Sequence, residues 1–136
     1  MTVTEDDRGP LLPMLQAARV IPVITIERVE DAVPLARALV DGGIRTLEVT
    51  LRTAAALEAA QAIMAEVPEA IVGLGTVLDA ADLARAQAIG ARFALSPGAT
   101  PELLDAAATA GLPFVPGIAT ASELMAALAR GFDVFK

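Results

Sequence analysis

A strand followed by a helix is the unit that repeats along this sequence of 136 residues. Short apolar runs bounded by turn residues predict strands, and longer runs with apolar residues at helical spacing predict helices. The predicted strands begin near residues Val20, Thr46, Ile71, Arg92, Pro113 and Val134. The last three intervals share one length, about 21 residues, which is a tight repeat for βα units. Short connections with right-handed crossovers join such units into a parallel sheet.

Start and stop signals delimit the predicted helices, which cover about residues 10–18, 29–40, 54–66, 80–89, 100–110 and 120–130. Residues with oxygen-bearing side chains are suited to cap three of them: Asp79, Thr100, and either Thr120 or Ser122. Glycines are suited to end four of them: Gly42-Gly43, Gly90, Gly111 and Gly131. Pro22 lacks a hydrogen-bond donor, so the first strand, predicted at 20–24, should be irregular there.

The predicted strand at 45–51 favours a barrel over a doubly wound open sheet. Its apolar residues fall on one face and its polar residues on the other, with Glu48 in the middle. The interior of a barrel near its C-terminal mouth can receive such a charge, whereas a helix-covered apolar face cannot. No dinucleotide or Walker pattern follows any strand, and Gly73-Leu74-Gly75 lacks the third glycine of the former. We therefore expect an α/β fold, a (β/α)8 TIM barrel.

The chain is expected to cover the N-terminal helix and about five and a half βα units of that barrel. Residues 1–136 should form a single barrel domain, with residues 1–9 flexible. A complete (β/α)8 barrel needs about 200 to 250 residues. We therefore expect the C-terminal part of the barrel to be missing from this sequence, or the fold to be completed by something else.

Composition narrows the classes of function. The sequence is 55% hydrophobic but only 3% aromatic, which is typical of buried parallel strands under alanine-rich helices. The lack of cysteine and histidine excludes disulfides, thiolate or imidazole metal sites and histidine acid–base catalysis; a carboxylate-only Mg²⁺ site stays possible. The net charge of −7 argues against nucleic-acid and anionic-membrane partners. The acidic N-terminus and the lack of a long apolar run predict a cytoplasmic protein.

Lys136 is the only lysine in the sequence, and it follows the apolar residues Val134 and Phe135. This setting suggests partial burial. Burial disfavours the charged form of an amine and so makes a lysine a nucleophile near neutral pH. The alternative is a lysine at the end of a strand that reaches solvent.

Polar residues and prolines gather at the predicted C-terminal ends of the strands, where barrel active sites lie: Glu48, Arg52, Thr76, Ser96, Pro97, Pro116 and Lys136. Each has a structural alternative. Glu48 and Arg52 could form an ion pair, Thr76 and Ser96 could cap helices, and the Pro-Gly pairs could serve as turns only. Together they provide an amine, a carboxylate and a guanidinium, which suit carbonyl chemistry through a Schiff base.

Six motifs resemble, in order, those of the 2-keto-3-deoxy-6-phosphogluconate (KDPG) aldolase family: residues 20–24 (VIPVI), 47–52 (LEVTLR), 71–78 (IVGLGTVL), 96–98 (SPG), 116–118 (PGI) and 135–136 (FK). The resemblance extends from about Ala18 to the last residue. It implies a class I, metal-independent aldolase without a cofactor, usually a homotrimer, that serves the Entner–Doudoroff pathway. It also implies Lys136 as the Schiff-base nucleophile, Glu48 as the general acid/base, and Arg52, Thr76 and Pro97 around the substrate carboxylate.

The resemblance predicts the cleavage of KDPG to pyruvate and glyceraldehyde 3-phosphate. Two alternatives stay open. The substrate could be another 2-keto acid, such as 4-hydroxy-2-oxoglutarate or the 6-phosphogalactonate analogue, because only the pyruvate half of the site can be assigned. The chain could also be a non-catalytic barrel fragment or an assembly scaffold. The glycine-rich loops that bind phosphate in the family have no counterpart in this sequence, so no phosphate-binding residue is predicted.

Overall fold

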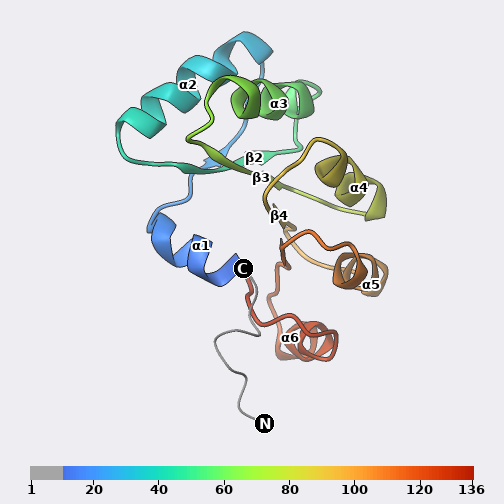
Figure 1. Ribbon diagram of the computed structural model, residues 1–136. Helices are drawn as coiled ribbons and strands as arrows, with labels where there is room; N and C mark the ends of the chain where they lie inside the picture. Colours follow the sequence, from blue (N-terminus) through green and yellow to red (C-terminus); the bar gives the residue numbers. More distant parts are fainter. Residues whose placement is uncertain (1–10) are drawn as a thin grey trace.

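The computed structural model describes residues 11–136, in which helices and strands alternate (Figure 1). The elements are α1 (Leu11–Ala18), β1 (Val23–Ile24), α2 (Val29–Asp41), β2 (Thr46–Thr50), α3 (Ala56–Glu66), β3 (Ile71–Gly75), α4 (Ala80–Ala88), β4 (Ala94–Leu95), α5 (Pro101–Thr109), β5 (Phe114–Val115) and α6 (Ala121–Leu128). The predicted alternation is confirmed within this range. The flexibility predicted for residues 1–9, and the start of the first helix at Pro10, lie outside the described residues.

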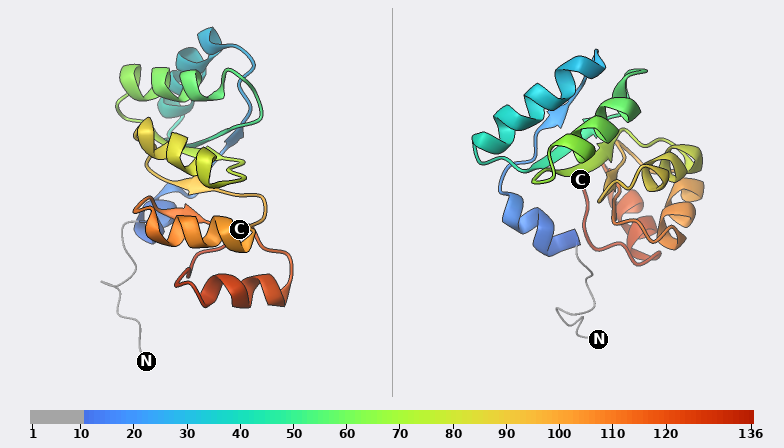
Figure 2. Two further views of the ribbon diagram at one scale, coloured as in Figure 1. Left: turned by 90° about the vertical axis from the view of Figure 1, so that its right-hand side faces the viewer. Right: turned by 45° about the horizontal axis from the view of Figure 1, so that its top comes forward.

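The strands form one parallel sheet in the order β1-β2-β3-β4-β5, so each strand pairs with its neighbour in the sequence. Helices α2 to α6 follow one another along the outer side of this curved sheet, and α1 lies on the inner side (Figure 1). The left view of Figure 2 shows α3 to α6 stacked in chain order. Consecutive order with the connecting helices on one side is the arrangement of a (β/α)8 barrel, not of a doubly wound sheet.

The edges of the sheet are less regular than its centre. The first strand begins at Val23, three residues later than predicted, because Pro22 has no N–H; its carbonyl accepts a hydrogen bond from Glu48 N at 3.1 Å. At the other edge, Lys136 N donates to Pro116 O at 3.0 Å, and Ile118 N donates to Lys136 O at 2.9 Å. These are the bonds of a parallel pair, so the predicted sixth strand is represented by the backbone of Lys136.

Two apolar layers cover the two faces of the sheet. The outer layer fills the space between strands and helices and includes Leu47, Val49 and Ile63. The inner layer is smaller: Leu11 of α1 packs there with Phe93, Leu95 and Val115. The short helix α1 therefore covers part of the barrel interior. Its contacts come from Leu11, Met14 and Leu15, which are among the apolar residues from which the helix was predicted.

The predicted helix signals are confirmed at both ends. Asp79 accepts from Asp82 N at 2.8 Å, Thr100 accepts from Leu103 N at 3.2 Å, and Thr120 forms a capping box with Glu123. Glycines with positive φ follow four helices: Gly43, Gly90, Gly111 and Gly131. Among residues 11–136, no helix has the length and apolar character that crossing a membrane requires.

Replacing Phe93 with alanine tests whether the inner layer contributes to stability. Phe93 is fully buried in that layer, so Phe93→Ala should lower the free energy of unfolding by about 3 to 5 kcal/mol. Urea denaturation measures the change. Leu128→Ala is the control, because Leu128 is 51% exposed, and its effect should stay within about 0.5 kcal/mol. Equal effects of the two variants would contradict an inner apolar layer.

Candidate active site

Glu48 lies in the middle of β2 and points into the barrel. Its Cα partners are Val23 of β1 and Gly73 of β3, so it sits between two strands. Its side chain is only 3% exposed, although a glutamate is rarely buried in a protein. The prediction that the charged residue of this strand faces the interior is confirmed.

Two glycines of β3 make the space that the side chains of Glu48 and Phe93 need. A Cβ atom on Gly75 would lie 1.9 Å from Glu48 Oε1, and a Cβ atom on Gly73 would lie 2.2 Å from the ring of Phe93. Only glycine lets the carboxyl and the aromatic ring approach the strand this closely. In the sequence, Gly73-Leu74-Gly75 is an incomplete dinucleotide pattern and part of the motif at 71–78. Two glycines at alternate positions of one strand are instead a signal for close approach on one face.

The charge on Glu48 is poorly solvated. Its Oε1 atom is buried and has no hydrogen-bond partner among the described residues. Burial raises the pKa of Glu48, and the positive charges of Lys136 and Arg52 oppose this increase to a smaller extent. Three side chains that the sequence assigned to one site are therefore close enough for their charges to interact.

Glu48 and Arg52 could form a structural ion pair or act separately in a binding site. Among residues 11–136, Glu48 and Arg52 do not form an ion pair. The structural ion pair is therefore wrong. Arg52 is exposed just beyond β2, which leaves its guanidinium available to an anionic ligand.

Lys136 is exposed, so the expectation that it is partly buried is wrong. Its backbone pairs with the segment after β5, and no other described strand lies on its other side. Its positive charge is nevertheless near enough to Glu48 to oppose the increase in the pKa of that carboxyl. The alternative of a strand-end lysine that reaches solvent thus describes the exposure of Lys136.

Thr76 follows β3 with a φ of 59°. A left-handed backbone is unusual for a β-branched residue and costs about 1 to 3 kcal/mol. Thr76 does not cap α4, because Asp79 does. The helix-cap alternative is therefore wrong for Thr76, and its strained backbone at the C-terminal end of a barrel strand makes it a candidate functional residue.

Ser96 and Pro97 lie where β4 ends. Ser96 is fully buried, and its Oγ accepts a hydrogen bond from Gly117 N at 3.3 Å. It joins the ends of β4 and β5 and does not cap α5, which Thr100 caps. Pro97 is exposed, and its carbonyl oxygen would lie 2.3 Å from a Cβ atom on Gly117. Gly117 was absent from the predicted site, although its close packing helps to fix the backbone at Pro97.

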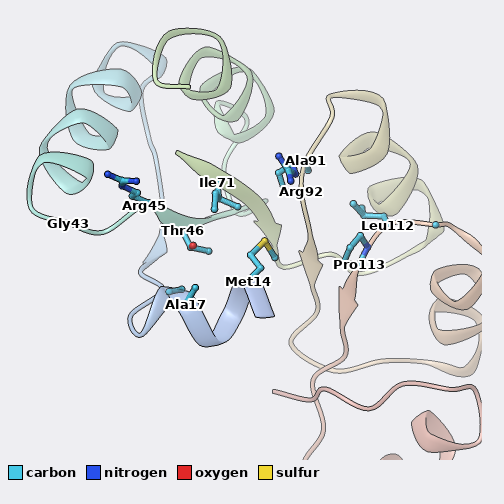
Figure 3. A pocket seen from close by; sticks show the side chains of 12 residues that line it. Met14, Ala17, Gly43, Arg45, Thr46, Ile71, Ala91, Arg92, Leu112 and Pro113 are labelled. Atoms are coloured by element: carbon cyan, nitrogen blue, oxygen red, sulfur yellow. The ribbon is translucent and has the colours of Figure 1, made fainter. Parts of the chain in front are cut away.

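A pocket lies at the other end of the barrel. It has a volume of about 690 Å³ and is lined by Met14 of α1, Ile71 of β3 and Pro113, among others (Figure 3). None of the predicted site residues lines it. We do not assign the chemistry to this pocket, because the catalytic residues of barrels lie at the C-terminal ends of the strands.

The C-terminal ends of the strands thus combine three chemical groups: an accessible amine, a buried carboxyl with a raised pKa and an exposed guanidinium. A carboxyl with a raised pKa can donate and accept protons nearer to neutral pH. Among residues 11–136, no group of three or more acidic side chains is arranged to hold a metal ion. The arrangement suits an amine that attacks a carbonyl, with a proton shuttle beside it.

A family model described as "KDPG and KHG aldolase" matches residues 12–136. The KHG/KDPG aldolase of Escherichia coli (strain K12) is 53% identical over 123 residues, which are 90% of this chain and 58% of that protein. The 2-dehydro-3-deoxy-phosphogluconate aldolase of Pseudoalteromonas atlantica is 55% identical over 117 residues, covering 86% of this chain and 54% of that one. The chain therefore spans somewhat over half the length of these relatives.

Solved structures agree with this comparison. The KDPG aldolase of Legionella pneumophila, captured with pyruvate as a covalent carbinolamine intermediate, has a TM-score of 0.85 and 48% identity over 88% of this chain and 58% of that one. The corresponding aldolase of Zymomonas mobilis ZM4 with 3-phosphoglycerate has a TM-score of 0.89 and 46% identity, covering 94% of this chain and 61% of that one. The chain thus follows the barrel of these proteins over most of its length.

Glu48→Gln tests the electrostatic environment of the carboxyl. Because burial raises its pKa, the folded protein binds more protons here than the unfolded chain, and this part of the stability decreases as the pH rises through the window between the two pKa values. Glutamine cannot ionise. The stability of the variant relative to the original protein should therefore increase as the pH rises above the ordinary glutamate pKa of about 4.3, as measured by urea denaturation at each pH.

Glu123→Gln is the matched control with the opposite sign. Hydrogen bonds from the backbone of Ala119 and from Thr120 lower the pKa of Glu123. Ionised Glu123 therefore stabilises the fold at higher pH, and this stabilisation is lost as the pH falls through its folded-state pKa. The stability of Glu123→Gln relative to the original protein should therefore decrease as the pH rises. The same trend in both variants would contradict the burial effect at Glu48.

Gly75→Ala tests the packing of β3 against Glu48. The new methyl group would overlap the carboxyl, and we expect a loss of about 1 to 3 kcal/mol in the free energy of unfolding. In a Glu48→Ala background the same substitution should cost almost nothing, which a double-mutant cycle measures. Gly98→Ala is the control, because no atom lies within 4 Å of a Cβ atom there. An equal cost of Gly75→Ala in both backgrounds would contradict the contact.

Proposed function

Since the chain belongs to the KDPG and KHG aldolase family, we propose that it provides the pyruvate half of a class I aldolase site that cleaves KDPG to pyruvate and glyceraldehyde 3-phosphate. The observation that carries this proposal is the convergence of charges at Glu48, where a buried carboxyl lies under the influence of both Lys136 and Arg52. The covalent pyruvate adduct of the Legionella pneumophila relative supports the same chemistry.

Lys136 is the nucleophile. Its unprotonated amine attacks the C2 ketone of the substrate and forms a carbinolamine, which loses water to give a protonated imine. Glu48 moves the protons that these two steps require, and its raised pKa suits both directions of transfer. A carboxylate without a hydrogen-bond partner is free to accept one from the reacting group or from a water molecule.

The imine then accepts the electrons of the bond that breaks. Removal of the proton from the C4 hydroxyl cleaves the C3–C4 bond and releases glyceraldehyde 3-phosphate. The electron pair moves into the imine and gives the enamine of pyruvate. Protonation of this enamine at C3 and hydrolysis of the resulting imine release pyruvate and restore the amine, so that no cofactor is consumed.

The substrate carboxylate is bound by Arg52 and Thr76, with Pro97 at the border of the site. The planar guanidinium of Arg52 can bind a carboxylate through two parallel hydrogen bonds, which a lysine cannot reproduce. This contact holds the C2 ketone near the amine and lowers the entropic cost of the attack.

A second 2-keto acid is a specific alternative, because the Escherichia coli relative carries both names, KHG and KDPG aldolase. The residues proposed here contact only the pyruvate part, which the two substrates share. The relative rates of cleavage of KDPG and 4-hydroxy-2-oxoglutarate distinguish the two. We also propose a homotrimer, as the family resemblance implies, and a cytoplasmic location, as the acidic N-terminus predicts. Sedimentation analysis measures the oligomeric state.

Trapping with borohydride tests the proposed nucleophile. Incubation with pyruvate and sodium borohydride should reduce the imine and add one pyruvate-derived group irreversibly. Trypsin cleaves after Arg130, so mass spectrometry of the peptide that begins at Gly131 can assign the adduct to Lys136 and distinguish it from the N-terminal amine. Lys136→Met should prevent the reaction, and Glu48→Gln should slow it by about 10²- to 10⁴-fold. An unmodified Lys136 after the reaction would contradict the proposal.

A further inference from the structure

Asp82 is a buried charged residue that the proposed reaction does not use. It lies in the first turn of α4, and it is only 7% exposed. One oxygen of its carboxylate accepts a hydrogen bond from Leu78 N at 3.0 Å, and the other pairs with Arg85. Asp82 therefore connects the start of α4 to the segment that follows β3.

That segment contains the strained residue Thr76. Backbone hydrogen bonds fix it on both sides: Leu51 N donates to Gly75 O at 2.9 Å, and Val77 N donates to Leu95 O at 3.0 Å. The bond from Leu78 to Asp82 fixes the next peptide unit. Thr76 must join these fixed units, and it does so with its backbone in the left-handed region.

A left-handed conformation of a β-branched residue persists only when its surroundings enforce it. The bond between Val77 and Leu95 belongs to the sheet and is present wherever two strands pair. The bond between Leu78 and Asp82 is different, because it depends on one buried side chain. At α6 the corresponding bond, from Ala119 N to Glu123 at 2.8 Å, depends on an exposed side chain instead.

We propose that Asp82 is a positioning residue for the substrate carboxylate, acting through Leu78 to keep Thr76 in its left-handed conformation. This inference rests on the proposed function, in which Thr76 and Arg52 bind the carboxylate of a 2-keto acid. Without the bond from Asp82, the segment relaxes to a negative φ at Thr76. The hydroxyl group of Thr76 then changes its position, and the substrate carboxylate loses one of its two proposed ligands.

Asp82→Ala and Asp82→Asn separate this role from a general one in stability. Alanine removes the acceptor for Leu78 N, whereas the amide oxygen of asparagine restores it and removes only the charge. Thr120→Ala is the matched control: it removes the cap of α6, and the segment before that helix contains no proposed site residue. The loss of stability in Thr120→Ala should resemble the loss in Asp82→Ala, and thermal unfolding measures both.

The conformational step is measured without reference to activity. The backbone chemical shifts and the HN–Hα coupling of Thr76 report the sign of its φ by NMR. Thr76 should keep a positive φ in the original protein, in Asp82→Asn and in Thr120→Ala, and lose it in Asp82→Ala. A positive φ that persists in Asp82→Ala would overturn the inference, because other contacts would then suffice.

The functional step is measured by the rate of borohydride trapping as a function of pyruvate concentration. Asp82→Ala should raise the half-saturating concentration by about tenfold, which corresponds to one lost contact of about 1.4 kcal/mol, and leave the maximal rate within about twofold. Asp82→Asn and Thr120→Ala should stay within about twofold in both quantities. An equal effect of Thr120→Ala, or an unchanged half-saturating concentration in Asp82→Ala, would overturn the inference. If the original protein forms no adduct, the proposed function fails, and the NMR experiment still decides whether Asp82 controls Thr76.

Discussion

The burial of one carboxyl group in the barrel interior is the constraint on which the site depends. Glu48 sits in a place where an anion is disfavoured, and its Oε1 has no hydrogen-bond partner among the described residues. The positive charges of Lys136 and Arg52 offset part of this cost. A buried carboxyl with a raised pKa near two positive charges is typical of functional sites, and it fits the proton transfer proposed for Glu48.

The barrel interior combines an apolar cluster with a few unfavourable features. Leu11 of α1 packs in the same inner cluster as Phe93. Beside this cluster lie the unfavourable features: a buried glutamate, a threonine with positive φ and close packing at Gly75. Local cost at a functional site is compensated by the rest of the fold, which explains why these features occur together.

The sequence predicted much of this arrangement, for identifiable reasons. Periodicity and helix signals placed every helix of the described residues, and alternation in β2 placed Glu48 inside. The exposure of Lys136 could not be predicted, because it depends on which strand lies beside it. The left-handed backbone of Thr76 and the bond from Asp82 to Leu78 also depend on tertiary contacts that no local pattern contains. The two alternate glycines of β3 were visible in the sequence, but only the structure showed that they make room for Glu48 and Phe93.

Titration of the Glu48 carboxyl carbon by NMR measures whether burial controls the protonation of this group. We expect a pKa above the ordinary glutamate value, because burial is the dominant influence. In Lys136→Met the pKa should rise further, since a positive charge that favours the ionised form has been removed. A pKa at or below the ordinary value, or one unchanged by Lys136→Met, would contradict a buried proton shuttle beside the amine.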